Sequence, residues 1–322
     1  MSIDVLAIGD LTVDQIFGPL RDLPAWGRET EVDTMDVRLG GNTGNFALAG
    51  KVLDLNVVCV GPVGKDDNGL WIKNEMEKSG LNTDLLDFRT DSPTSVTTAL
   101  VREDGERLFI TLPGALAKLG QTLHQSRYSD AKIALLSGWC QPPRVAMDIL
   151  LDAFTRLRTT GTKIAIDLAW SEASWGVRDD VLKILSQVDF ALMNSDEAAA
   201  LSGETGLISA AETISEKLAQ SAVLVIKNGE HGALVKERHK PCVIVPIVSM
   251  GEPAHAVGAG DCFNAGFFHA VFVQKLDAEA ATAFGCDFAT WMLVHGREAI
   301  VDVSTVSSSR RQAGLNQSGD LL

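Results

Sequence analysis

Four short apolar runs in the second half of the chain decide the fold: Ile133-Ala-Leu-Leu136, Lys163-Ile-Ala-Ile-Asp167, Phe190-Ala-Leu-Met193 and Ala222-Val-Leu-Val-Ile-Lys227. Each has the length of one buried β-strand. Longer stretches with a helical pattern separate them, at residues 145–158, 181–188 and 210–220. Strict alternation of strand and helix is typical of βαβ units. The sequence therefore predicts an α/β fold built on a mostly parallel sheet.

Two segments of the first half have a different pattern. Between residues 28 and 39, charged residues alternate with sparse apolar ones, as in a half-exposed strand. Residues 95–112 hold two strand-like runs around Glu103-Asp-Gly-Glu106, which is a strong hairpin signal. We expect these segments to form a small sheet that stands off the main body.

Composition limits the function classes. The 322 residues fit one large domain, with 46% hydrophobic and 22% charged residues. A net charge of −14 argues against nucleic acid as a partner. Five scattered cysteines without CxxC spacing predict neither a disulfide framework nor a zinc site. Because the N-terminus lacks a signal-peptide pattern and no apolar run reaches membrane-spanning length, we expect a cytoplasmic protein with no membrane partner.

The stretch Val257-Gly-Ala-Gly-Asp261 carries the clearest chemical signal. Small residues precede a predicted helix at 262–274, so backbone N–H groups can converge on an anion. A carboxylate at the edge of an anion pocket suggests that a phosphoryl group arrives while a proton leaves, as in a kinase acting on a hydroxyl. Taken alone, the same turn also fits simple helix capping.

A second glycine-rich loop, Leu39-Gly-Gly-Asn-Thr-Gly-Asn45, lies between an exposed strand and a predicted helix. Gly40 and Gly41 would let a ligand lie against bare backbone, and Asn45 offers a donor and an acceptor to a polyol. Asp14 follows a strand that the apolar run at residues 5–8 predicts, near the edge where α/β sheets bind ligands. Each of these also fits a solvated loop or a helix cap.

Six segments in the same order resemble the ribokinase-like (PfkB) carbohydrate kinase family, over nearly the whole chain. They are Gly40–Asn45, the glycines and aspartate of residues 61–69, the turn at 104–107, Asn194-Ser-Asp-Glu197, Lys227-Asn-Gly-Glu-His-Gly232 and Gly258–Asp261. The resemblance implies a three-layer αβα sandwich with a small β-sheet lid, formed by about residues 15–39 and 95–112, in one domain spanning 1–322.

The resemblance also implies the roles of individual residues. Asp261 would be the general base, and the amides of Gly258, Ala259 and Gly260 the anion hole. Asp14, Gly40, Gly41 and Asn45 would hold a sugar acceptor. ATP would lie near Asn194, Lys227, Gly229 and Gly232, while Glu197 and Asn194 would act on Mg²⁺ through its waters.

Departures from the family pattern leave alternatives open. His255-Ala256 replace the usual Asp-Thr, so a monovalent-cation site is doubtful. Asn42-Thr43 and Asp167-Leu-Ala-Trp170 depart from patterns linked to ribose and to acidic sugars. The first hypothesis is a kinase for a hydroxyl, expected to be primary, of a small sugar; a nucleoside kinase and a non-catalytic sensor are alternatives. We expect a homodimer through the lid and a poorly ordered tail at 307–322.

Overall fold

The structure is a computed structural model that describes residues 2–125, 130–139, 144–169, 178–251, 258–296 and 306. Two predictions lie outside these residues: the effect of His255-Ala256 on a cation site, and the order of the tail at 307–322. Within the described residues, no helix is both long and apolar enough to span a membrane.

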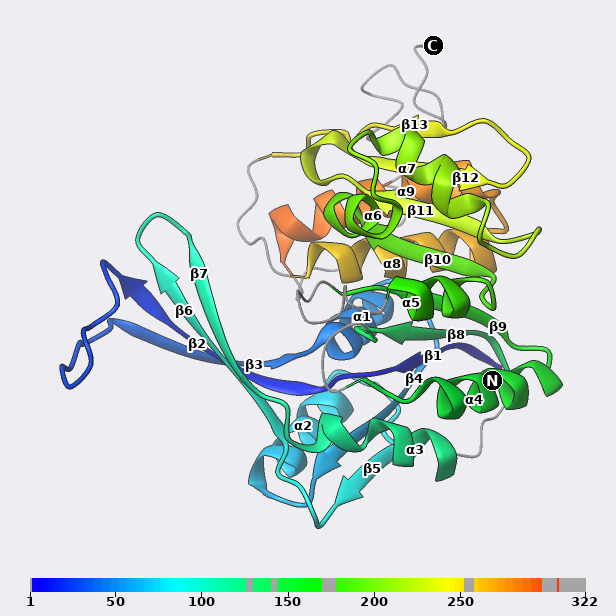
Figure 1. The fold of residues 1–322 in the computed structure, drawn as a ribbon. Helices are drawn as coiled ribbons and strands as arrows, with labels where there is room; N and C mark the ends of the chain where they lie inside the picture. The colour runs from blue at the N-terminus through cyan, green and yellow to red at the C-terminus, as the bar shows by residue number, and fades with distance from the viewer. Residues whose placement is uncertain are drawn as a thin grey trace.

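A nine-stranded sheet forms the centre of the molecule (Figure 1). Its order is β13-β12-β11-β10-β9-β8-β1-β4-β5, with every pair parallel except β11–β12 and β12–β13. The strands are β1 (Ile3–Ile8), β4 (Val57–Gly64), β5 (Leu86–Arg89), β8 (Ala131–Ser137), β9 (Lys163–Asp167), β10 (Phe190–Asn194), β11 (Val223–Lys227), β12 (Ala233–Glu237) and β13 (Val243–Val245). The predicted parallel α/β fold is confirmed.

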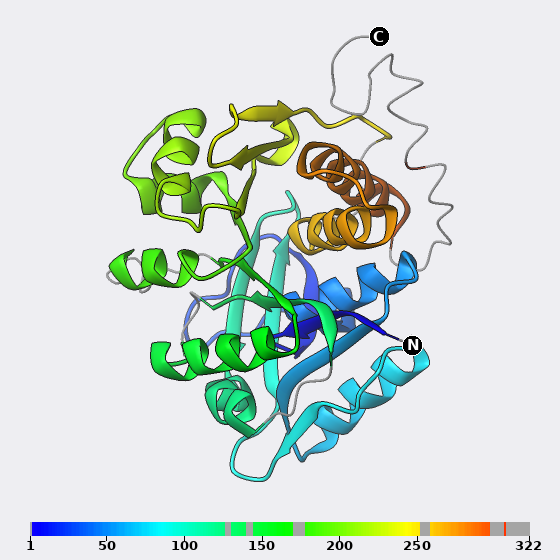
Figure 2. The ribbon, with the colours of Figure 1, turned by 90° about the vertical axis from the view of Figure 1, so that its right-hand side faces the viewer.

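Helices cover both faces of this sheet, which gives three layers (Figure 2). One face carries α1 (Asn42–Val52), α2 (Asp67–Lys78), α8 (Ala259–His269) and α9 (Ala278–His295). The other carries α3 (Leu119–Gln125), α4 (Met147–Thr159), α5 (Arg178–Leu185), α6 (Ser195–Ser202) and α7 (Leu207–Ser215). Successive strand residues point to opposite faces, so Phe190 and Leu192 join one hydrophobic core while Ala191 and Met193 join the other.

A separate four-stranded sheet projects from the body (Figure 1). Its order is β3-β2-β6-β7, and the strands are β2 (Thr12–Leu20), β3 (Thr34–Gly40), β6 (Ser95–Arg102) and β7 (Arg107–Leu112). A short 3-10 helix, η1 (Gly114–Lys118), leads from β7 to α3. β3, β6 and β7 lie in the two segments whose pattern predicts exposed strands, whereas β2 precedes the first of these segments. The predicted small sheet is confirmed, with one strand that the pattern did not reveal.

The two faces of the small sheet differ in polarity because its strands are in register. Asp14 lies opposite Arg38 and beside Thr97, which in turn lies opposite Thr111, so one face is polar near the body. The neighbouring positions on every strand point the other way. That second face presents, in chain order, Val13, Gln15, Phe17, Met35, Val37, Leu39, Val96, Thr98, Leu100, Leu108, Ile110 and Leu112. It is mostly apolar.

Three details differ from what the sequence predicts. The sequence has an apolar run at residues 55–60 that Gly61-Pro62 would be expected to end, but the strand continues to Gly64. There β4 pairs with β5, while its pairing with β1 covers only Val57–Val60, so the missing N–H of Pro62 faces a side without a ladder partner. The last helix, α9, was not predicted. The predicted helix at 262–274 begins at Ala259 and ends in a π-helical turn, η4 (Ala270–Gln274).

Candidate active site

Four polar side chains lie at the carboxyl ends of parallel strands. Asp10 comes two residues after β1, Asp167 ends β9, Asn194 ends β10 and Lys227 ends β11. The carboxyl ends of parallel strands share one edge of the sheet, where α/β proteins bind their ligands. Three of these strands are adjacent, which brings residues from distant parts of the chain together.

The glycine-rich turn forms the start of α8, as the sequence predicts. Gly258 caps the helix with φ 81°, in the left-handed region that glycine adopts without strain. Ala259, Gly260 and Asp261 form the first turn, whose N–H groups have no acceptor within the helix. The turn therefore presents free donors beside a carboxylate that is only 6% exposed.

Burial raises the pKa of Asp261 well above its usual range, and the charge of Asp167 raises it further. The Lys227 ammonium acts in the opposite direction, as does a hydrogen bond with the Asn45 side chain. Asp10 adds a weaker repulsion. A carboxylate whose pKa is moved towards neutrality accepts a proton more readily, which suits a general base.

Lys227 and Asp167 form a close ion pair beneath this turn. The Lys227 ammonium lies 2.9 Å from Asp167 Oδ1 and 2.8 Å from Oδ2. Asn264 Nδ2 donates to Asp167 Oδ2 over 2.5 Å, and Asn264 Oδ1 lies 3.5 Å from the ammonium. Burial lowers the pKa of Lys227, but the charges of Asp167, Glu197 and Asp261 outweigh it and raise that pKa overall.

On the acceptor side, Asp14 lies against Gly40. A Cβ at Gly40 would come within 2.0 Å of Asp14 Oδ2, so a residue with a side chain cannot stand there without displacing the carboxylate. Thr12 Oγ1 donates to Asp14 Oδ1 over 2.5 Å. Gly41 has φ 79°, and a Cβ there would lie 2.5 Å from the Asp10 carbonyl oxygen. Because a side chain at either position would clash with these neighbouring groups, both positions require glycine.

Asp10 is a nearly buried carboxylate on this side of the site. It accepts the Asn42 N–H at the start of α1 with both of its oxygens, at 3.1 and 3.0 Å. Burial raises the pKa of Asp10, the backbone hydrogen bonds lower it, and the charge of Asp14 raises it. Since Asp10 acts electrostatically on both Asp14 and Asp261, it links the predicted acceptor residues to the predicted base.

Asn194 and Glu197 form a capping box at the start of α6. Asn194 Oδ1 accepts the Glu197 N–H over 2.8 Å, and Glu197 Oε2 accepts the Asn194 N–H over 2.7 Å. Glu197 is 2% exposed. Among the described residues, no three histidine, cysteine or acidic side chains are grouped so as to hold a metal ion. This donor set fits a hydrated ion brought by a nucleotide better than a cage made by the protein alone.

The predicted nucleotide glycines lie in the turn after β11. Gly229 begins the 3-10 turn η3 (Gly229–His231) with φ 56°, and Gly232 follows with φ 88°. A Cβ at Gly232 would lie 2.0 Å from the Val245 carbonyl oxygen on the neighbouring β13. Gly232 is therefore needed for the close packing of β13, whatever it contributes to nucleotide binding.

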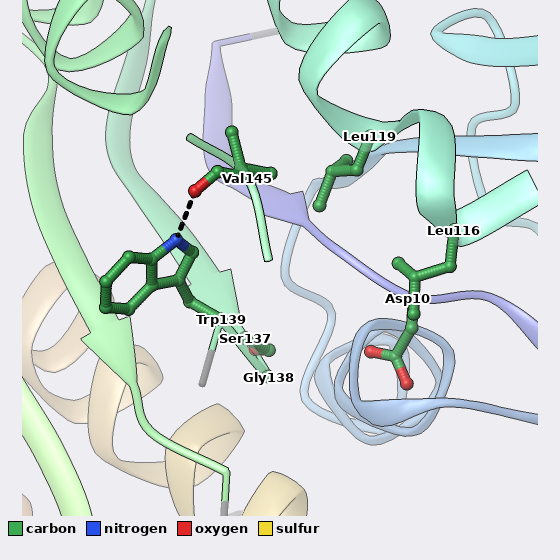
Figure 3. Close-up of a pocket in the computed structure, with 7 residues that line it drawn as sticks. All are labelled: Asp10, Leu116, Leu119, Ser137, Gly138, Trp139 and Val145. Carbon is green, nitrogen blue, oxygen red and sulfur yellow. Dashed lines mark hydrogen bonds between the residues drawn. The ribbon is translucent and has the colours of Figure 1, made fainter. Parts of the chain in front are cut away.

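A small cavity of about 10 Å³ lies beside Asp10 (Figure 3). Its other lining residues are Leu116, Leu119, Ser137, Gly138, Trp139 and Val145. Trp139 is 5% exposed, and its Nε1 donates to the Val145 carbonyl oxygen over 3.2 Å (Figure 3). The cavity has room for about one water molecule, so Trp139 acts here as a packing residue.

The sequence did not assign Asp10, Asp167 or Asn264 to the site. Asp10 and Asp167 each stand directly at the end of an apolar run, which is a signal that sequence reasoning can use. Asn264 offers no such signal: its place one helical turn after Asp261 acquires meaning only because β9 brings Asp167 against it.

In the comparison with known protein families, residues 2–300 match the family described as "pfkB family carbohydrate kinase". The chain belongs to the pfkB family of carbohydrate kinases. This pfkB-family kinase is similar to the ribokinase of Haemophilus influenzae, with 23% identity over 76% of this chain and 78% of that protein.

Two solved structures show the same fold. The nucleoside kinase of Methanocaldococcus jannaschii aligns with a TM-score of 0.78 at 17% identity, covering 96% of this pfkB-family kinase and 98% of that chain. The ribokinase of Arabidopsis thaliana, complexed with ribose and ATP, aligns with a TM-score of 0.77 at 19% identity, covering 96% and 99%. At these identities the likeness concerns the fold and leaves the acceptor open.

Proposed function

We propose that this pfkB-family kinase transfers the γ-phosphoryl group of ATP to a hydroxyl, expected to be a primary one, of a small sugar. The observation that carries the proposal is the start of α8, where the buried Asp261 carboxylate adjoins the N–H groups of Gly258, Ala259 and Gly260, which have no acceptor within the helix. The match to the family supports it.

Each group then has one task. Asp261 takes the proton as the acceptor oxygen bonds to the γ-phosphorus, the bond from that phosphorus to the bridging oxygen breaks, and ADP leaves. The helix N–H groups stabilise the charge on the transferring phosphoryl oxygens. Asp14, with the backbone of Gly40 and Gly41, orients the acceptor hydroxyls, and the small sheet shields the site from water as a lid.

Magnesium would accompany ATP and neutralise charge on its phosphates. Asn194 and Glu197 stand at the carboxyl end of β10, and their oxygens are engaged in the capping box. We propose that they act on the hydrated ion through water rather than as direct ligands. Gly229 and Gly232, in the turn after β11, stay candidates for the nucleotide side.

A nucleoside is the second candidate acceptor, because the small sheet offers an apolar platform. On the same face as Asp14, the next row along the strands places Ile16 beside Ala99 and Ala99 opposite Phe109. Phe109 is 56% exposed. An exposed aromatic ring one row beyond a hydroxyl-binding carboxylate is suited to stack against a planar base.

The apolar face of the small sheet supports the proposed homodimer. On the face opposite Asp14, Met35 is 60%, Ile110 60% and Leu112 51% exposed. A contiguous exposed apolar face usually marks an interface. A second copy of the chain would bury this face against itself around a twofold axis.

A panel of pentoses, hexoses, sugar acids and nucleosides, screened by thermal shift, tests the acceptor class, because a ligand of the native state raises the unfolding midpoint. ADP release is then measured with the best ligand. We expect turnover by the parent and at least about a 100-fold loss in Asp261→Asn, the usual scale for a general base.

Asp152→Asn is the matched control, since Asp152 lies on α4 with a side chain 56% exposed. It should retain parental turnover. ADP release by Asp261→Asn within tenfold of the parent would defeat the proposed role. No ADP from the parent at high protein concentration would favour a sensor that binds without catalysis.

A further inference from the structure

The Lys227 ammonium occupies an unusual electrostatic position. A Cβ built on Gly260 would lie 3.3 Å from Lys227 Nζ, so the ammonium lies directly against the first turn of α8. A helix N-terminus carries partial positive charge, and a cation is ordinarily unfavourable there. The Lys227 side chain is also only 16% exposed. Something specific must hold the charge in this place.

Asp167 and Asn264 hold it. Both carboxylate oxygens of Asp167 contact the ammonium, and Asn264 Nδ2 donates to the same carboxylate. Asn264 is fully buried and lies three residues after Asp261, one turn further along α8. The pair is thus fastened to the very helix that carries Asp261, and any displacement of Lys227 would disturb this helix.

The ammonium has little capacity left for a nucleotide. A lysine offers three donors. Asp167 Oδ1, Asp167 Oδ2 and Asn264 Oδ1 all lie within 3.5 Å of Nζ. A phosphate contact would need one of these to be given up. The geometry therefore favours a role towards the protein's own carboxylates over direct nucleotide binding.

The charges around Asp261 show what that role is. Asp167 and Asp10 both disfavour its ionised form, as burial does, while Lys227 favours it. Asn45 adds a neutral hydrogen bond. Removing the ammonium would leave three carboxylates, Asp10, Asp167 and Asp261, and the described residues show no other cation acting on Asp261. Loss of the ammonium would therefore favour the protonated form of Asp261, which cannot serve as a base.

We propose that Lys227, clamped by Asp167 and Asn264, is a positioning residue that keeps Asp261 ionised and aimed at the acceptor. This rests on the proposed function, in which Asp261 accepts the proton of the attacking hydroxyl. Lys227 touches neither reacting atom; it acts through the charge of Asp261.

Four variants test the proposal: Lys227→Met, Lys227→Arg, Asp167→Asn and the double variant of Lys227→Met with Asp167→Asn. The main readout is the acid limb of kcat/KM against pH, at saturating ATP and Mg²⁺. Lys227→Met should move that limb upward by about one pH unit, the scale of a nearby charge. Lys227→Arg should keep it within about 0.3 units of the parent.

The double variant removes one positive and one negative charge together. Its acid limb should return to within about 0.5 units of the parent. Because it removes both members of the buried ion pair, Asp167 is not left without its partner, and the variant also guards against a Lys227→Met protein that fails to fold. Asp167→Asn removes a repulsion from Asp261, so its limb should not rise.

A second readout needs no acceptor. The difference in unfolding midpoint between each variant and the same variant carrying Asp261→Asn, followed against pH, reports the titration of Asp261. With Lys227→Met this titration should move to higher pH. It works even when turnover is absent, so failure of the inference and failure of the proposed function can be told apart.

Two results would overturn the inference. A KM for ATP raised tenfold in Lys227→Met, with an unchanged acid limb, would assign the ammonium to the nucleotide. Equal loss of kcat at every pH in Lys227→Met and the double variant, with the titration of Asp261 unmoved, would make Lys227 a structural residue only.

Discussion

Lys227 and Asp167 are 60 residues apart in the chain, and their side chains meet at 2.8 Å where β11 and β9 end. In the sheet, β10 lies between these two strands. Lys227 lies against Gly260 in the first turn of α8, and Asp167 accepts a hydrogen bond from Asn264 of the same helix. The ion pair is therefore a joint between the sheet and the helix that carries the proposed base.

Asp261→Asn should stabilise the protein at neutral pH. The pKa of Asp261 is raised in the folded state, so its contribution to stability is present in full below the unfolded pKa and is lost as pH rises through the folded pKa. Asparagine does not ionise, so the variant does not lose stability as the pH rises. The gain in unfolding midpoint over the parent should be positive at pH 8 and shrink towards pH 4, measured by thermal unfolding without ligands. A midpoint difference that does not vary with pH would contradict the raised pKa.

Glu197 combines a structural and a chemical task that two substitutions can separate. Glu197→Gln can keep the capping box with Asn194, so we expect parental stability but a higher requirement for Mg²⁺ in ADP release. Glu197→Ala also removes the half of the capping box in which Glu197 Oε2 accepts the Asn194 N–H, and the loss of this hydrogen bond should cost about 1 kcal/mol of unfolding free energy. Chemical denaturation and magnesium titration measure the two effects. Equal stability of all three proteins would mean that the cap contributes nothing.

Gly40→Ala should weaken acceptor binding without abolishing the chemistry. The new methyl group would overlap the Asp14 carboxylate, which must move. We expect at least about a tenfold rise in KM for the acceptor, or about 1.4 kcal/mol, with little change in KM for ATP. Gly120→Ala is the control, since a Cβ at this position in α3 meets only ordinary contacts. If KM for the acceptor stays unchanged, Asp14 does not hold the acceptor.

Phe109 and Ile110 are neighbours in β7 that point to opposite faces of the small sheet, with exposed fractions of 56% and 60%. Ile110→Lys should convert the proposed dimer to a monomer, because it places a charge in the apolar face. Phe109→Lys should leave the dimer intact and weaken binding of a nucleoside, if that is the acceptor. Light scattering after size-exclusion chromatography measures the first effect. A parent protein that elutes as a monomer would refute the dimer.

The alternation of strand and helix in the second half was predictable from the chain alone. Apolar runs such as Lys163–Asp167 and Phe190–Met193 have the length and composition of buried strands. The helical stretches between them predict that these strands pair in parallel. The exposed strands of the small sheet were also predictable, because their alternating pattern excludes burial on both faces. The continuation of β4 through Pro62 was not predictable, since it depends on which strand lies beside β4 at that point.

Some features of the candidate site could likewise be predicted from the sequence, whereas others became visible only in the structure. Gly258, Gly260 and Asp261 could be recognised because a helix N-terminus with small residues has a local chemical meaning. The need for glycine at position 40 could not be recognised in the sequence. Only the structure shows that the Asp14 carboxylate fills the space that a side chain at this position would occupy. The family resemblance implied that Lys227 lies near ATP, which stays a prediction, and only the structure shows that its ammonium contacts Asp167.

By itself, the sequence determined the α/β class, the presence of a small exposed sheet and the residue that we propose as the base. Local propensity, periodicity and turn chemistry act over a few residues, so a linear pattern can reveal them. Only the tertiary structure decided what surrounds Asp261, because the charges of Asp10, Asp167 and Lys227 come from the carboxyl ends of three different strands. Electrostatic interactions depend on distance in space, and the folded sheet sets that distance.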